Sequence, residues 1–397
     1  MKLSVVVVLA ACSNAPATAP DAAAPAADAS ADSAVDSGPL YPAFTVPVVQ
    51  VMTQGGPVMH DVRIVPVYWQ GDAGADAVTT WLQAFAASPY YAQMTAEYGV
   101  TGGLEIATPV TLAVAAPATT TDANIQQLIA SRLNGSYPAW GPVDAATIAR
   151  SIYMIHYPST TSGTGPHGQA SCGFGGYHHS FAFGSGSVIY AAVYDCPSTQ
   201  NAAPTAVFGH EIVEAVTDPL VGAMPAFNQL APQFRAWGIE EGAEVGDMCE
   251  GDPSAYVTPT GFAHRLQRTW SNAAAAAFHD PCVPAPSGAY FNSIAIEPDI
   301  IDAATQLPGT QIALGQSRTI DLQLASDGPS EAWTLDGVDD THALTFAFDP
   351  ATGQNGDTVH LTITANTMPA NGIVTYRIRS SIGTRRTFWT GAVSVTQ

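Results

Sequence analysis

The sequence predicts two folded parts, a mixed α/β part at residues 45–285 and an all-β part at residues 286–397. Two observations support this division. Strand-like apolar runs alternate with helical patterns up to the Pro-rich segment Pro281–Gly288, which is typical of an α/β fold. After that segment, short runs of alternating apolar and polar residues are separated by Gly, Asn, Asp and Pro turns, which is typical of an all-β fold.

The first 44 residues are predicted to be a leader and a tether. MKLSVVVVLAAC has the pattern of a lipoprotein signal at residues 1–11, with lipidation at Cys12. An ordinary secretory signal cleaved near Ala17 or Ala19 is the alternative. Residues 12–44 are almost entirely Ala, Pro, Ser, Thr and Asp, so they cannot bury a core. We therefore expect an exported protein anchored by lipid at the outer membrane or cell surface, with no other membrane contact.

The charge of the chain excludes some partners. Without Lys2, which is the only lysine, 11 Arg stand against 33 Asp and Glu, a formal charge of −22. Nucleic acid and anionic lipid headgroups are poor partners for such a surface. We therefore expect no nucleic-acid binding.

The cysteines predict two disulfides. Beyond Cys12, four remain in an exported chain, and an even number of cysteines there indicates disulfide bonds. Three pairings are possible, and the shortest loops favour Cys172 with Cys196 and Cys249 with Cys282. Oxidised cysteines also argue against a thiol nucleophile.

The elements of the α/β part follow from apolar periodicity and capping residues. The order of strands and helices indicates a mixed sheet followed by a helix that carries the candidate chemistry. We expect strands at Val62–Trp69, Ser151–Pro158 and Ser187–Cys196, and helices at Ala77–Tyr98, Thr121–Leu133 and around Gly209–Pro219.

The all-β part is predicted to be an immunoglobulin-like sandwich of six or seven strands. It contains no Cys and no cluster of His or carboxylates, so we expect a spacer or a binding module. The alternating runs are Arg318–Ala325, Glu331–Gly337, Leu344–Pro350, Val359–Ala365, Val374–Ser380 and Phe388–Val395.

The candidate chemistry lies in GHEIVEAVTDP, where His210, Glu211 and Glu214 form His-Glu-x-x-Glu. This differs in one residue from the His-Glu-x-x-His of zinc peptidases. Of the 10 Glu in the chain, six lie within the 40 residues 211–250. A plain solvated helix is the alternative, but such a helix normally carries both charge signs. This one has no Lys or Arg, which favours a divalent metal as the missing positive charge.

Helical spacing assigns roles to these side chains. His210 and Glu214 lie one turn apart and can bind the same ion, while Glu211 faces the side where a water would be activated and is the candidate general base. Asp218 lies on the same face as a further supporting carboxylate. Zinc is the first expectation, with manganese, iron and calcium open, and the helix predicts a zincin-like α/β fold.

A third metal ligand is expected downstream, in IEEGAEVGDMCEG. By analogy with thermolysin-like enzymes, Glu244 is the candidate ligand, and Asp247 is the candidate acceptor for the second ring nitrogen of His210. Glu240 and Glu241 remain competing ligands.

Two histidines in the Gly-rich segment SCGFGGYHHSFAFGSG could add to the site. His178 and His179 are adjacent, so at most one can point into a cleft from a strand. That residue would be a fourth ligand or a transition-state donor; the alternative is a loop histidine with no chemical role. His156 is expected to be a core or sheet-face residue.

Several segments resemble, in order, those shared by the phosphate-induced protein 1 (Exordium-like) family and its bacterial extracellular relatives. The resemblance covers about residues 60–284 and leaves out the all-β part. It implies a secreted protein in which the His-Glu-x-x-Glu helix and a later Glu-x-x-Asp run form one site, here His210, Glu211, Glu214, Glu244 and Asp247. It implies no particular reaction. The segments are VPVYWQG, SPYYAQMTAEYG, CGFGGYHHS, GHEIVEAVTDP, GAEVGDMCEG and LQRTWSNAAAAA.

Together these features predict a cell-surface metallohydrolase, a peptidase acting on an extracellular peptide or a wall-associated substrate. The alternative is a non-catalytic surface lipoprotein that binds wall polysaccharide or a partner protein. An ion site closed by a fourth protein ligand would favour the alternative, because catalytic sites keep one position open.

Overall fold

The computed structural model describes residues 39–135, 137–173, 175–196, 204–251 and 253–397. The predicted signal, the lipidation site at Cys12 and the tether up to residue 38 lie outside the described residues. From Leu40 to Gln397 the chain forms one compact unit. Within the described ranges, the helices are all too short or too polar to cross a bilayer.

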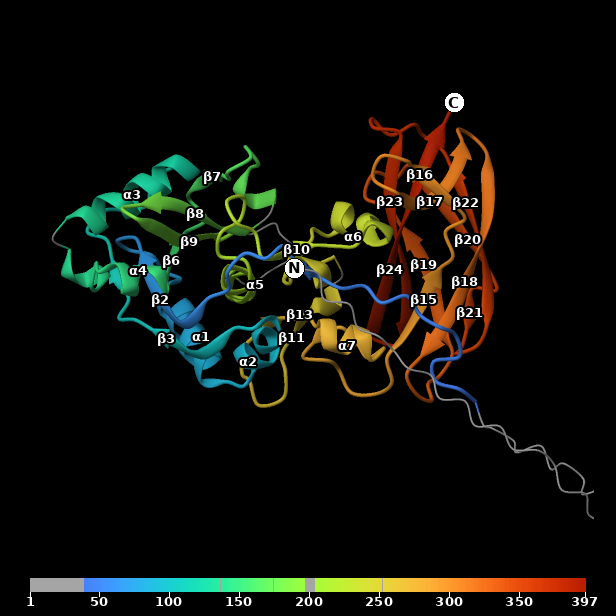
Figure 1. The fold of residues 1–397 in the computed structure, drawn as a ribbon, viewed down its shortest axis with the longest axis horizontal. Helices are drawn as coiled ribbons and strands as arrows, with labels where there is room; N and C mark the ends of the chain where they lie inside the picture. Colours follow the sequence, from blue (N-terminus) through green and yellow to red (C-terminus); the bar gives the residue numbers. More distant parts are fainter. Residues whose placement is uncertain (1–38, 136, 174, 197–203, 252) are drawn as a thin grey trace, which may run out of the picture. The chain divides into compact units, whose positions relative to one another are not determined.

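A six-stranded sheet organises the α/β part (Figure 1). It contains β2 (His60–Tyr68), β3 (Thr101–Ile106), β4 (Val110–Thr111), β6 (Ser151–Tyr157), β8 (Gly176–Phe183) and β9 (Gly186–Tyr194). The order is β3-β2-β6-β9-β8, with β4 paired to β2. All pairs are parallel except β8 with β9. The three predicted strands are thus confirmed, and β8 is an additional edge strand.

Helices cover both faces of this sheet. The helices are α1 (Ala75–Ala87), α2 (Tyr90–Thr95), α3 (Asp122–Asn134), α4 (Ala145–Ala149) and α5 (Pro204–Thr217). Alternate strand residues point to opposite faces, so Ile64 and Ile152 share a core with α1, α2 and α5. Val65 and Tyr153 share the other core with α3 and α4. The helix predicted as one segment at 77–98 is divided at Pro89, because proline lacks the N–H that a continuous helix needs.

Short elements complete the α/β part. Among the described residues they are four two-stranded pairs, two short helices and six 3₁₀ turns. The strand pairs are β1 (Met52–Thr53) with β10 (Phe227–Gln229), β5 (Thr119–Thr121) with β7 (Ser162–Thr164), β11 (Tyr256–Val257) with β12 (Leu266–Gln267), and β13 (Thr269–Trp270) with β14 (Cys282–Val283). The helices are α6 (Arg235–Glu240) and α7 (Asn272–Ala276), with single 3₁₀ turns at η1 (Ala96–Tyr98), η2 (Pro138–Trp140), η3 (Ser171–Gly173), η4 (Pro232–Phe234), η5 (Asp247–Cys249) and η6 (Pro253–Ala255).

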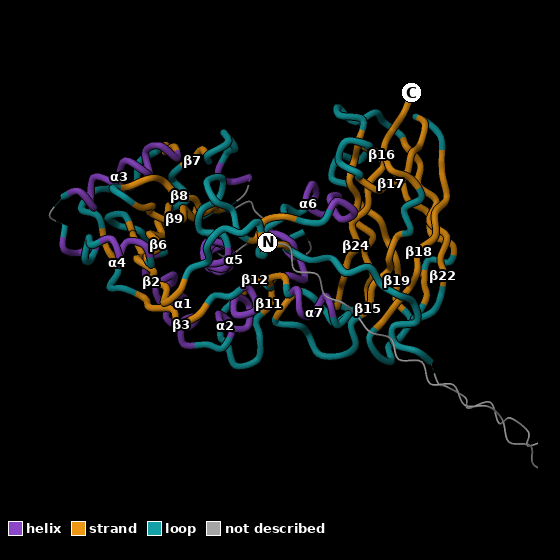
Figure 2. The backbone as a smooth tube through the Cα atoms, viewed as in Figure 1, coloured by secondary structure: helices purple, strands orange, loops and turns teal. Residues whose placement is uncertain are grey.

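The all-β part is sandwich-like, with two sheets whose side chains share one core. One sheet has the order β15 (Phe291–Ala295), β18 (Ser317–Ser326), β22 (Thr358–Ala365), β20 (Leu344–Asp349). The other has the order β16 (Asp299–Asp302), β17 (Leu307–Ala313), β24 (Arg385–Thr396), β23 (Ile373–Ile382), β19 (Trp333–Val338), β21 (Thr352–Gly353). Figure 2 shows these strands joined by loops, and the described residues after α7 contain no helix. The six predicted runs are confirmed as strands. The expected total of six or seven is too low, because β15, β16, β17 and β21 bring the described strands of this part to ten.

Trp333 lies at the centre of the sandwich core. It is fully buried, and its ring centroid lies 5.3 Å from that of Phe291. Its indole nitrogen donates to the Ser293 hydroxyl at 2.9 Å, which satisfies the polar atom that burial of a tryptophan would otherwise leave unpaired.

The α/β part and the sandwich are in direct contact through α6. The ring of Trp237 lies 5.3 Å from that of Phe388 and 5.5 Å from that of Trp389, both on β24. On the same side, the buried Arg377 of β23 pairs with Glu240 and Glu241. Apolar rings and a buried ion pair therefore both join the sandwich to the segment that leads into the candidate site.

Two disulfides close loops within the α/β part. They join Cys172 to Cys196 and Cys249 to Cys282, which is the pairing favoured by loop length. Disulfides form and persist in oxidising compartments, so they indicate an extracytoplasmic protein. The second disulfide also fastens η5, because Cys249 is its last residue.

Candidate metal centre

Helix α5 carries His-Glu-x-x-Glu and is buried on all sides. Its apolar face belongs to the core, with Phe208, Ile212 and Val216 at 0% exposure. The opposite face is also covered, because His210 is 7% and Glu214 is 3% exposed. The motif therefore does not lie on a solvated surface helix.

Gly209 allows α5 to approach α1 closely. A Cβ atom at this position would lie 3.0 Å from the ring of Trp81, which is tighter than most side-chain contacts. The glycine costs the helix about 1 kcal/mol relative to alanine, and close packing of the two helices offsets this cost.

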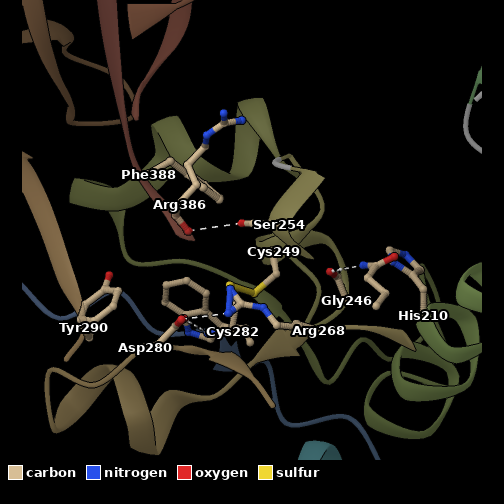
Figure 3. The surroundings of a disulfide bond; sticks show 12 residues. His210, Gly246, Cys249, Ser254, Arg268, Asp280, Cys282, Tyr290, Arg386 and Phe388 are labelled. Carbon is tan, nitrogen blue, oxygen red and sulfur yellow. Dashed lines mark hydrogen bonds and ion pairs between the residues drawn. A yellow bond between two sulfur atoms is a disulfide. The ribbon is translucent and has the colours of Figure 1, made fainter. Parts of the chain in front are cut away.

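A first group of ligand atoms comes from His210, Glu214 and Asp247. His210 Nε2 lies 3.0 Å from Glu214 Oε1 and 3.6 Å from Asp247 Oδ1, and the three atoms lie within 4.8 Å of one another. The backbone N–H of Asp247 donates to Glu214 Oε1 at 3.0 Å, so η5 is fixed against α5. Figure 3 shows His210 facing Gly246, beside the Cys249–Cys282 disulfide that holds this segment.

Asp247 occupies a different position from the one the sequence predicted. It lies beside Nε2 of His210, the same ring nitrogen that faces Glu214, and not beside Nδ1. The neighbours of Nδ1 are the amide nitrogen of Gln267 at 2.8 Å and Glu250 Oε2 at 3.9 Å. When Nε2 binds an ion, Nδ1 carries the proton and must donate a hydrogen bond. Either the Gln267 side chain turns its amide oxygen to Nδ1, or the Glu250 carboxylate moves closer and accepts this hydrogen bond.

A second group of ligand atoms comes from His178, Glu211 and Glu214. His178 Nδ1 lies 3.5 Å from Glu214 Oε2 and 3.7 Å from Glu211 Oε2. His178 is 6% and Glu211 is 2% exposed. Gly176 makes room for Glu211, because a Cβ there would lie 2.8 Å from Glu211 Oε1.

The two adjacent histidines of β8 point to opposite faces of the sheet, as strand alternation predicts. His178 faces α5, whereas the ring of His179 lies 6.3 Å from that of Tyr190 on the other face. The Nδ1 atom of His179 contacts its neighbour Ser180 through the backbone. His179 therefore does not contribute to either group of ligand atoms.

Glu244 and Asp218 border the second group. Glu244 Oε1 lies 3.6 Å from His178 Nε2, so Glu244 is beside His178 and not beside His210. The carboxylate of Asp218 accepts from the backbone of Ala226 and from Asn228, each at 2.6 Å. Asp218 therefore ties the end of α5 to β10, and its backbone oxygen lies 3.1 Å from His178 Nε2.

Glu240 and Glu241, the competing third ligands, lie outside the site. The Glu241 carboxylate is paired with the guanidinium of Arg377, and that of Glu240 lies 3.0 Å from the same group. The physical reason is that Arg377, on a strand distant in the sequence, pairs with both glutamates. No local sequence pattern predicts this pairing. His156 is 2% exposed and pairs with Asp72 at 2.7 Å, so it is a buried residue of the sheet, as expected.

The electrostatics of the site are dominated by buried carboxylates. Among the described residues, the ion pairs of Glu211, Glu214, Glu244 and Asp247 are with His178 and His210 only. Burial raises the pKa of Glu244 and Asp247 well above the usual range, and the neighbouring carboxylates raise it further. Burial lowers the pKa of His210, but Glu214 and the other carboxylates outweigh it and raise that pKa well above normal. Such a cluster is suited to a cation.

One contributing residue had no signal in the sequence. Gln267 of β12 contacts both His210 and the backbone oxygen of Gly246. It lies 57 residues from His210 in the chain, and an isolated glutamine is not recognisable as part of a site. Gly246 also had no signal in the sequence. The Glu214 carboxylate packs against its backbone, because a Cβ there would lie 2.6 Å from Glu214 Oε1.

Comparisons with known proteins give no functional assignment. No family model matches the sequence, and no curated protein matches it. Among solved structures, the titin M3 domain aligns with 28% of this chain and 97% of its own, at 14% identity and a TM-score of 0.17. A Bacteroides ovatus GH5 xyloglucanase in complex with a XXXG heptasaccharide aligns with 22% of this chain and 17% of its own, at 16% identity and a TM-score of 0.16. Scores this low support no conclusion about fold or function.

Proposed function

We propose that this protein is an extracytoplasmic metal-dependent hydrolase, with the ion held by His210, Glu214 and Asp247 and with Glu211 as the general base. The convergence of one atom from each of three residues within 4.8 Å is the observation that carries the proposal. Asp247 replaces Glu244 as the third ligand, because Asp247 and not Glu244 lies beside His210.

The donor set fits a divalent transition metal. Two ligands about 2.1 Å from a tetrahedral ion lie about 3.4 Å apart, and the separations from His210 Nε2 are 3.0 Å to Glu214 and 3.6 Å to Asp247. Three protein ligands leave a fourth position for substrate or water, as in catalytic zinc sites. A bound ion would polarise the carbonyl of the substrate and lower the pKa of a water molecule.

The chain's own residues would handle the proton. Glu211 is next to His210 in the sequence, is 2% exposed, and its Oε2 has no hydrogen-bond partner among the described residues. A buried carboxylate oxygen without a donor is ready to accept the proton of the attacking water. Peptides are the proposed substrate class, by analogy with the His-Glu-x-x-His enzymes.

The proposal also covers the fold type of each part and the location of the protein. The mixed sheet with α5 against it supports a zincin-like α/β part, and the two-sheet core around Trp333 supports an immunoglobulin-like type for the sandwich. The segments similar to the phosphate-induced protein 1 family include α5 and the η5 segment, which supply the proposed ligands. The two disulfides support export, and lipid attachment at Cys12 would hold the protein at the outer membrane or cell surface.

The assay that tests this function is cleavage of a peptide library by the purified protein, read by mass spectrometry. We expect cleavage that a chelator abolishes and that one equivalent of zinc restores. Cleavage that survives complete removal of metal would refute the metal-dependent mechanism.

A second candidate function, binding of an acidic wall polysaccharide, is favoured by one cavity. A cavity of about 590 Å³ is lined by Arg268, Arg385 and Arg386 together with Tyr256. Arg385 contacts a backbone oxygen and the ring of Phe291, and no carboxylate lies within ion-pair distance of it among the described residues. Guanidinium groups recognise carboxylates well. Arg268 already pairs with Asp280 at 2.8 Å, so Arg385 and Arg386 are the groups that this candidate uses.

Calorimetric titration with oligogalacturonate tests this second candidate. We expect binding to the parent protein, weakened at least tenfold in Arg386→Gln and unchanged in Arg150→Gln, a partly exposed arginine that pairs with Glu105. Equal affinities for all three proteins, or no heat of binding with the parent, would remove it.

A further inference from the structure

Glu214 faces two histidines with its two carboxylate oxygens. Oε1 lies 3.0 Å from His210 Nε2, and Oε2 lies 3.5 Å from His178 Nδ1. The two groups of ligand atoms described above therefore share one side chain without sharing an oxygen. A carboxylate placed in this way can bind one ion with each oxygen.

The hydrogen bond of His178 directs a lone pair at the carboxylates. Nε2 of His178 lies 3.1 Å from the backbone oxygen of Asp218. A carbonyl oxygen can only accept, so Nε2 carries the proton, and in the neutral ring Nδ1 presents its lone pair. Nδ1 faces Glu211 Oε2 and Glu214 Oε2. A backbone carbonyl that fixes the ring in this way is the usual support of a metal-binding histidine.

The distances within this group suit an ion better than direct hydrogen bonds. The separations from Nδ1 are 3.5 and 3.7 Å, longer than the roughly 2.7–3.2 Å of an N–H···O hydrogen bond. They are close to the spacing of about 3.4 Å between two ligands of a tetrahedral zinc ion. Independently, Glu211 Oε2 has no hydrogen-bond partner although Glu211 is 2% exposed, and a buried unpaired carboxylate oxygen is costly unless a cation compensates it.

The charge of the cluster leaves room for two ions. Glu211, Glu214, Glu244 and Asp247 bring four carboxylates, and their ion pairs among the described residues are with histidines only. One divalent ion at His210 compensates the two carboxylates that would bind it, those of Glu214 and Asp247. Glu211 then still lacks a cation, which a second divalent ion would supply.

We propose that a second divalent cation binds at His178 Nδ1, Glu211 Oε2 and Glu214 Oε2, with Glu214 bridging it to the ion at His210, and that this second ion inhibits hydrolysis. The binding half stands on the geometry alone. The inhibition half rests on the proposed function, because Glu211 cannot act as a base while it binds the second ion. The first ion supports hydrolysis, and a second ion bound at higher metal concentration stops it.

Stoichiometry of metal binding tests the second site directly. Metal-free protein is titrated with zinc in a calorimeter, and bound zinc is measured by mass spectrometry after desalting. We expect two equivalents in the parent, one in His178→Asn, one in His210→Asn, and two in the matched control His360→Asn, which alters a histidine on β22 that is exposed and remote from the cluster. Saturation of the parent at one equivalent, or two equivalents retained by a folded His178→Asn protein, would overturn the second site.

Electron paramagnetic resonance with manganese provides a readout that loss of folding cannot imitate. Two ions bridged by Glu214 should give an exchange-coupled spectrum in the parent at two equivalents, and single-site variants should give the six-line spectrum of isolated manganese. Two uncoupled six-line signals in the parent would contradict the bridge. Glu211→Gln, which keeps the size of the side chain, should also lose one equivalent only.

Activity separates this inference from the proposed function. If the protein cleaves peptides, zinc beyond one equivalent should lower the rate at least tenfold, and an undiminished rate would refute inhibition. If no peptide is cleaved, the stoichiometry and the manganese spectrum still decide whether the second ion binds. Saturation at one equivalent in a protein whose cleavage depends on metal would overturn the second site alone.

Discussion

Replacing Glu211 with Gln is expected to lower the rate of peptide cleavage by about 10²- to 10⁴-fold, the usual contribution of a general base. The amide has nearly the size of the carboxylate, and Glu211 is buried between α5 and β8, so packing should be preserved. The ion at His210, Glu214 and Asp247 should remain, because Glu211 is not one of its ligands. The measurement is initial rate with the best peptide from the library screen, alongside the zinc content of the same sample.

Glu331→Gln is the matched control for this variant. Glu331 is exposed and lies in the sandwich part, so the same chemical change there should leave the rate unchanged. A Glu211→Gln protein that cleaves as fast as the parent would exclude Glu211 as the base. A slow variant that has also lost the first ion would show that Glu211 acts as a ligand of that ion.

Replacing Arg377 with Ala is expected to lower the free energy of unfolding by about 3–5 kcal/mol, the usual cost of removing one partner of a buried ion pair. The Arg377 side chain is 10% exposed, and its partners Glu240 and Glu241 are 7% and 1% exposed. Without the guanidinium, two buried carboxylates lose their counter-charge at the contact between α6 and β23. Guanidinium unfolding followed by tryptophan fluorescence measures the effect.

Arg379→Ala is the control on the same strand. Arg379 pairs with Asp336 at a more exposed site, with side-chain exposures of 30% and 52%, and such pairs contribute only about 0–1 kcal/mol. Equal losses for the two variants would mean that the buried pair has no special role. Glu241→Gln in the Arg377→Ala background should recover part of the stability, because it removes one of the uncompensated charges.

The stability of Arg377→Ala should also depend on pH. Burial raises the pKa of Glu241 from 4.5 to about 7, although Arg377 opposes this shift. The pKa of Glu241 is higher in the folded than in the unfolded protein. At pH values between these two pKa values the folded protein binds the extra proton, so its stability rises as the pH falls through this range. The variant, which lacks the opposing guanidinium, should therefore lose less stability relative to the parent near pH 5 than near pH 8. A difference that does not change with pH would contradict this.

The main strands and helices could be predicted from the sequence because they depend on local patterns. The apolar run of β2 and the alternation along β18 or β22 identify strands without tertiary information. β8 escaped prediction because its segment is rich in glycine, and it exists as a strand through its antiparallel pairing with β9. The division of the long helix at Pro89 could have been read from the proline itself.

Only the part of the candidate site that lies on α5 could be predicted from the sequence. His210 and Glu214 face one another because they are one turn apart on α5. Downstream, several carboxylates lie within a few residues of one another, and tertiary contacts decide which of them faces the helix. Arg377, which is 136 residues from Glu241 in the sequence, pairs with Glu241 and keeps it outside the site. The disulfide at Cys249 holds η5 in place, and Asp247 is the residue that lies beside His210.

Metal content is the most direct test of the account, because every chemical statement about α5 depends on an ion. The purified protein is exposed to zinc, dialysed and analysed by mass spectrometry beside His210→Ala, Asp247→Ala and the control His360→Ala. We expect at least one equivalent of zinc in the parent and the control, and loss of the ion at His210 in the two site variants. A parent that folds without binding zinc, or site variants that bind as much as the parent, would contradict the account and leave α5 as a buried structural helix.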